Sequence, residues 1–148
     1  MKIALKYGLL ITLGVIAWVV IAHLLVPDPR SQVHNLGAGI FFNLLEIAGI
    51  YLAINTRRNE TGGHLNFKSG MKTGVATAFV YAITSCLFFL VAIFTVGSKL
   101  MASEPGAETL PLWQIALGAF VGLGLGALIF GLIYSTIISF FLAKRQQS

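Results

Sequence analysis

The chain has 148 residues, of which 57% are hydrophobic and only 10% are charged. Soluble domains carry about 25% charged residues, so this composition excludes an ordinary water-soluble domain and predicts a protein that lies in lipid. The net charge of +5 does not indicate a nucleic-acid partner, because the basic residues gather at the ends of apolar segments.

Four segments are apolar enough to cross a bilayer, which requires about 20 residues of helix. They cover residues 7–26, 36–55, 67–97 and 112–143. The sequence therefore predicts an all-α, four-transmembrane-helix bundle that forms a single membrane domain over residues 1–148. The fourth segment is longer than a hydrocarbon core of about 30 Å requires, so we expect it to tilt, bend or extend into water.

The basic residues predict which ends of the helices face the cytoplasm. One group occupies the N-terminus, the middle loop and the C-terminus: Lys2, Lys6, Arg57, Arg58, Lys68, Lys72, Lys144 and Arg145. The opposite side has only Arg30 and Lys99. The positive-inside rule places both termini in the cytoplasm of a multi-pass protein of the bacterial inner membrane. Within the middle loop, Asn66 is expected to cap the third helix, and the basic side chains of Arg57, Arg58, Lys68 and Lys72 are expected to face anionic lipid.

Small residues recur at every fourth position in the third and fourth segments. In lipid, helices associate by close packing, which favours such ladders. The third segment contains Gly70, Gly74, Ala78 and Ala82, and the fourth contains Gly118, Gly122 and Gly126, followed by a second series at the same interval that includes Gly131. The two ladders could pack against each other within the chain, which is the interpretation we favour, or one could receive a helix of another subunit.

Glu46 is the single ionisable residue in the middle of a predicted span. Such groups are costly in a membrane and usually face the bundle interior. Asn43 lies three residues earlier, on the same helix face, and Tyr81, Thr84 and Ser85 of the third segment are candidate partners. We expect Glu46 to be protonated and hydrogen-bonded. It either forms a hydrogen bond that holds helices together or couples protons or cations to transport.

No pattern in the sequence predicts catalysis. The metal-binding and nucleophile motifs of hydrolases are absent, and Cys86 is the single cysteine. We therefore expect no catalytic residues, no metal site and no cofactor.

Several short motifs resemble those of a known family. They are Lys6-Tyr7-Gly8, the pair Arg57-Arg58, the pair Gly62-Gly63, and Phe67-x-x-Gly70-x-Lys72-x-Gly74. They are similar to the small four-helix bacterial membrane proteins, common in Bacteroidota, that form a family of unknown function. The resemblance implies the topology and a plasma-membrane location, and no functional residues.

The sequence thus favours a non-enzymatic structural or accessory subunit. Its partners would be the lipid bilayer and either a homo-oligomer or other membrane subunits. The alternative is a small transporter or proton-coupled carrier that uses Glu46 and Asn43.

Overall fold

The computed structural model describes residues 1–25, 32–96 and 111–144. It contains four α-helices: α1 (Lys2–Leu25), α2 (Gln32–Glu60), α3 (Phe67–Val96) and α4 (Leu112–Lys144). Each is long and apolar enough to cross a membrane, which confirms the predicted all-α class. Arg30, Lys99 and Arg145, used above to predict topology, lie outside the described residues.

The helices extend further than the apolar segments. α1 begins at Lys2 rather than at residue 7, and α2 continues to Glu60 rather than ending at residue 55. The reason is that helical hydrogen bonding continues where the hydrocarbon stops, as long as no residue breaks it. α4 is one continuous helix of 33 residues, so the glycines it contains do not interrupt it.

The loop between α2 and α3 is built from glycine and capping bonds. Gly62 and Gly63 have positive φ angles of 68° and 89°, a conformation that side chains disfavour. Arg58 Nε donates a hydrogen bond to the Gly63 carbonyl at 3.1 Å, across this turn. Asn66 Oδ1 then accepts a hydrogen bond from the Lys68 backbone N–H at 3.0 Å, which confirms Asn66 as the cap of α3.

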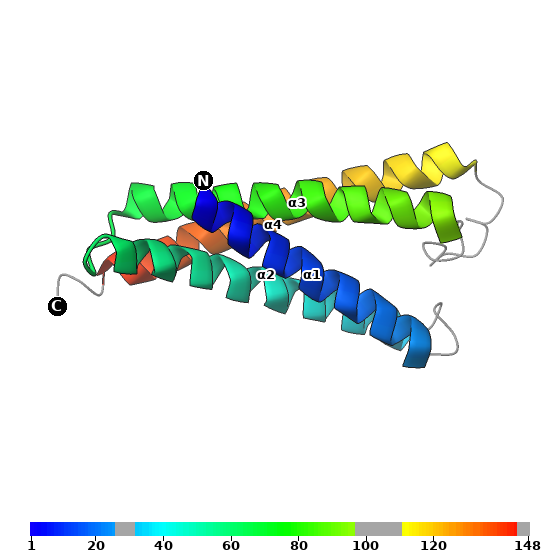
Figure 1. Cartoon of the computed structure of the whole chain (residues 1–148), viewed down its shortest axis with the longest axis horizontal. Helices are drawn as coiled ribbons and strands as arrows, with labels where there is room; N and C mark the ends of the chain where they lie inside the picture. The colour runs from blue at the N-terminus through cyan, green and yellow to red at the C-terminus, as the bar shows by residue number, and fades with distance from the viewer. Residues whose placement is uncertain (26–31, 97–110, 145–148) are drawn as a thin grey trace.

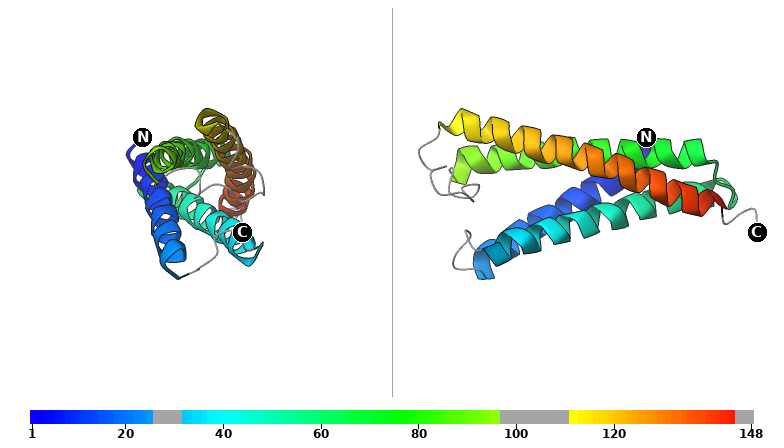
Figure 2. Two further views of the ribbon diagram at one scale, coloured as in Figure 1. Left: turned by 90° about the vertical axis from the view of Figure 1, so that its right-hand side faces the viewer. Right: turned by 180° about the vertical axis from the view of Figure 1, so that it is seen from behind.

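The four helices alternate in direction, and α2 and α3 each contact the other three helices. α1 and α4 flank α3, as the end-on view in Figure 2 shows. The start of α1, the loop between α2 and α3 and the end of α4 lie in the same half of the molecule (Figure 1). We call this half the basic end, because it carries Lys2, Arg57, Arg58, Lys68 and Lys72. Away from it, the pair α1–α2 diverges from the pair α3–α4 (Figures 1 and 2).

The small residues of α3 meet a matching set on α4. A Cβ added to Gly70 would lie 2.8 Å from Ser139 Oγ, and one added to Gly74 would lie 2.7 Å from Ser135 Cβ. One turn further along, a Cβ added to Gly131 would collide with Ala78. These approaches are closer than side chains tolerate, so the contact requires small residues. Ala82 is buried as well, as the ladder predicts.

The other half of the predicted α4 ladder does not take part in this contact. Among the described residues, nothing lies within 4 Å of a Cβ built on Gly118, Gly122 or Gly126. Gly118 and Gly122 are exposed. Gly131 therefore lies against α3, whereas these three glycines do not contact it in the described part of the chain. The helical repeat explains the difference, because Gly118, Gly122 and Gly126 lie on the side of α4 roughly opposite to Gly131 and Ser135.

Candidate intramembrane polar site

Glu46 is buried where α2 crosses α3 and α4, with only 3% of its surface exposed. Its Oε1 atom lies 2.9 Å from the position that a Cβ on Gly131 would take. Gly131 therefore makes room for both the carboxyl group and the close approach of Ala78. Within the residues that the structure describes, Oε1 has no hydrogen-bond partner. A buried oxygen without a partner is uncommon and requires an explanation.

Asn43 connects α2 to α4 one turn from Glu46. Its Oδ1 accepts a hydrogen bond of 2.7 Å from the Tyr134 hydroxyl, and its Nδ2 donates one of 2.8 Å to the Gly39 carbonyl. Tyr134 was not among the residues predicted from the sequence. The available signal was its spacing of three residues from Gly131, which places both on one face of α4.

Two of the three candidate partners on α3, Thr84 and Ser85, contact α1 and not Glu46. Thr84 Oγ1 lies 2.5 Å from Thr12 Oγ1 of α1, and Ser85 Oγ lies 3.5 Å from the same atom. Tyr81 is buried. The expected hydrogen bond from these residues to Glu46 Oε1 is absent from the described part of the chain. Thr12 is a second residue that the sequence reasoning missed.

The site is thus a buried carboxyl group beside two polar contacts between helices. Among the described residues, an ion pair joins Arg57 to Glu60 at 3.3 Å, outside this site. No cluster of three metal-binding side chains occurs among the described residues. Chemically, an unpaired carboxyl can take up and release a proton or, when ionised, bind a cation.

The four basic residues predicted to face lipid have different surroundings. Arg57 is paired with Glu60, and Arg58 is held by the Gly63 carbonyl. Lys68 and Lys72 are exposed on the first turns of α3, and of these two only Lys72 lines the pocket described below.

Comparison with known proteins gives a family but no activity. The model of a family described as a protein of unknown function (DUF4199) matches residues 6–103. No curated protein and no solved structure matches the chain.

Proposed function

We propose that the chain, which belongs to the DUF4199 family, is a non-enzymatic structural or accessory subunit. In this proposal it packs against copies of itself or within a larger membrane complex. The observation that carries the proposal is the outward glycine face of α4, which consists of Gly118, Gly122 and Gly126 and which no described residue approaches within 4 Å.

The position of this face fits an interface between membrane helices. Three glycines at intervals of four let two backbones approach closely, and that approach is what stabilises helix pairs in lipid. α4 also has the smallest share of its span buried by its own chain, 18% against 39% for α3. It therefore has the largest surface to offer to a neighbouring helix.

The test is the oligomeric state of the full chain in a gentle detergent. We expect native mass spectrometry to find either a defined homo-oligomer or a partner protein at a fixed ratio. Replacing Gly118 and Gly122 by leucine should release the monomer, because the added side chains hold the helices apart. Gly39→Leu is the matched control, since Gly39 is also an exposed helical glycine with nothing within 4 Å.

Two results would contradict the subunit proposal. One is a monomeric wild-type chain that brings no other protein with it. The other is an assembly that survives the double replacement at Gly118 and Gly122 unchanged. Loss of the assembly in Gly39→Leu as well would mean that any added leucine disrupts it, and would remove the support for the glycine face.

A second candidate is a proton-coupled carrier that uses Glu46 and Asn43. The specific observation in its favour is the buried Oε1 of Glu46, for which the described residues offer no hydrogen-bond partner. Carriers use such carboxyl groups to bind the coupling ion. Asn43, through its bond to Tyr134, would link protonation of Glu46 to the contact between α2 and α4.

Proton flux into liposomes that contain the purified chain distinguishes the two candidates. A carrier should dissipate a pH gradient, and Glu46→Gln should abolish this flux while leaving the protein folded. Glu60→Gln, which changes an exposed carboxyl at the end of α2, should leave the flux unchanged. If liposomes with the wild-type chain are no leakier than empty ones, proton transport through Glu46 without a co-transported solute is refuted.

We also propose that the basic end faces the cytoplasm of a bacterial inner membrane. The support is the excess of lysine and arginine at that end. Single-cysteine variants on a Cys86→Ser background test it with a membrane-impermeant maleimide. Gln114→Cys should be labelled in intact cells, and Glu60→Cys only after the cells are opened. The reverse pattern would refute the orientation.

A further inference from the structure

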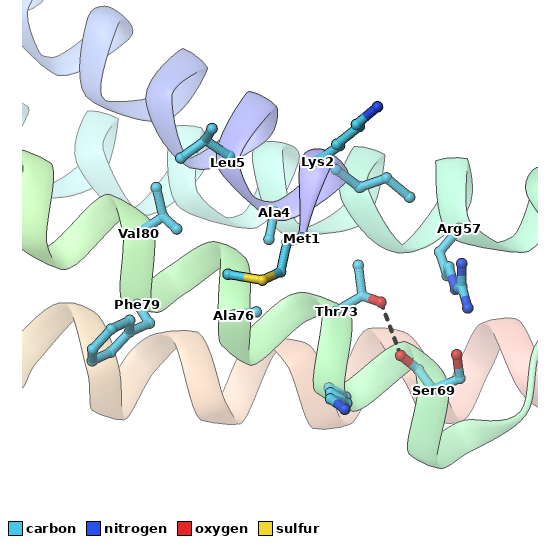
Figure 3. Close-up of a pocket in the computed structure, with 12 residues that line it drawn as sticks. Met1, Lys2, Ala4, Leu5, Arg57, Ser69, Thr73, Ala76, Phe79 and Val80 are labelled. Atoms are coloured by element: carbon cyan, nitrogen blue, oxygen red, sulfur yellow. Dashed lines mark hydrogen bonds between the residues drawn. The ribbon is translucent and has the colours of Figure 1, made fainter.

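A pocket of about 540 Å³ lies at the basic end, between the first turns of α1 and α3 and beside the end of α2. Figure 3 shows that residues of these three helices line it. The pocket is lined by Met1, Lys2, Ile3, Ala4, Leu5, Arg57, Ser69, Lys72, Thr73, Ala76, Phe79 and Val80. Neither Glu46 nor the outward glycines of α4 belong to it, so it is separate from both features discussed above.

The pocket exists because α1 and α3 touch closely beyond it and have small side chains along it. A Cβ on Gly8 would lie 2.6 Å from Val80 Cγ1 and 3.0 Å from the Thr77 carbonyl oxygen, so the helices are in contact at this point. Towards the basic end, Ala4 and Ala76 line the gap with a single methyl group each. The space that larger residues would fill is left open.

One part of the pocket is cationic. Lys2, Arg57 and Lys72 come from three different helices, and the lining contains no acidic residue. Arg57 is paired with Glu60 at 3.3 Å, but this pair is about half exposed, so the arginine keeps donors for another anion. The Thr73 hydroxyl donates to the Ser69 carbonyl at 3.0 Å, and Ser69 adds a second hydroxyl to the wall.

The other part of the pocket is apolar and faces along the helices towards the middle of the bundle. In Figure 3, Phe79 and Val80 lie at the end away from Arg57 and Ser69. Phe79 is 53% exposed and Leu5 55% exposed, so both present apolar surface to lipid. The pocket therefore changes from cationic to apolar in the direction in which a phospholipid changes from headgroup to acyl chain.

We propose that this pocket binds a phosphate-bearing ligand, with the phosphate at Lys2, Arg57 and Lys72. The apolar wall favours an anionic phospholipid whose acyl chain lies on Leu5, Phe79 and Val80, over a free phosphate ion. Three cationic residues favour an anionic over a zwitterionic headgroup, because choline would bring a positive charge towards the lysines.

Native mass spectrometry of the full chain tests the proposal with three probes: dioleoylphosphatidylglycerol, dioleoylphosphatidylcholine and inorganic phosphate. We expect one phosphatidylglycerol to stay bound under conditions that strip phosphatidylcholine. Each lysine near a lipid surface changes affinity by about fivefold, so Lys2→Gln with Lys72→Gln should weaken binding by about 25-fold. Lys68→Gln is the control, because Lys68 lies one turn from Lys72 but outside the pocket.

Each outcome decides a separate point. Equal retention of the two lipids would overturn the proposal, and so would an equal loss in Lys68→Gln, which would indicate general surface attraction. Binding of inorganic phosphate that the double variant abolishes, without retention of either lipid, would support the phosphate site and assign it to a free ion. Phe79→Ser separates these sources, because it should weaken the lipid complex and leave phosphate binding unchanged.

Discussion

Gly131→Ala is the smallest change that tests the structure at its most crowded point. The added methyl group would collide with Ala78 and lie 2.9 Å from Glu46 Oε1. A Cβ cannot rotate away, so the backbones of α3 and α4 must separate. Overpacking of this kind costs about 1–3 kcal/mol of unfolding free energy. Alanine is also the better helix former by about 1 kcal/mol, which partly masks that cost.

A second glycine removes this ambiguity. Gly39→Ala makes the same chemical change in α2, where nothing lies within 4 Å of the new methyl group. The gain in helix propensity is then common to both variants and cancels in their comparison. The difference that remains is the overpacking at Gly131, about 1–3 kcal/mol.

The single cysteine provides the assay. Cys86 is buried on α3, with its thiol 3.8 Å from the Phe120 carbonyl of α4, so separation of these helices exposes it. Unfolding in mixed micelles with increasing SDS can be followed by the reaction of Cys86 with a fluorogenic maleimide. Gly131→Ala should unfold at a lower SDS fraction than Gly39→Ala. Equal midpoints would refute the packing of α4 against Ala78 described above.

The same assay checks three further predictions. Tyr134→Phe removes the 2.7 Å bond to Asn43 and should cost about 0.6 kcal/mol, the average for such bonds in membranes, whereas Tyr51→Phe on the exposed face of α2 should cost nothing measurable. Thr12→Val removes the contacts with Thr84 and Ser85 and should destabilise by a similar amount, about 0.6 kcal/mol; an unchanged midpoint would mean that these hydroxyls do not hold α1 to α3. Gly63→Ala forces a side chain to a φ of 89° and should cost about 1–2 kcal/mol, so a neutral result would contradict the conformation of the loop between α2 and α3.

The fold could be predicted from the sequence because hydropathy and length alone identify helices that cross a membrane. The cap at Asn66 could also be predicted from the sequence, because it depends on a hydrogen bond between residues within one helical turn. The two ladders correctly indicated that α3 and α4 pack closely. These features depend on residues near one another in the chain.

The sequence does not determine how each helix is rotated about its own axis. In water, an apolar stripe marks the buried face, but a helix in lipid is apolar on every side. The helical repeat puts Gly118 and Gly131 on different sides of α4, but the sequence does not say which side faces α3; in the structure Gly131 does. The same uncertainty led us to place Thr84 beside Glu46, whereas it faces Thr12. Tyr134 was not predicted as part of the site because its partner, Asn43, lies 91 residues away in the chain.

The place of Glu46 also affects how the chain is made. The residues around its carboxyl group come from α3 and α4, which follow α2 in the chain and are therefore synthesised after it. While only α1 and α2 are in the membrane, the carboxyl group has neither Ala78 nor Gly131 beside it and is open to lipid. A hairpin in that state bears a polar group in hydrocarbon, which costs free energy. Insertion of α4 brings Gly131 beside the carboxyl group and so completes its enclosure.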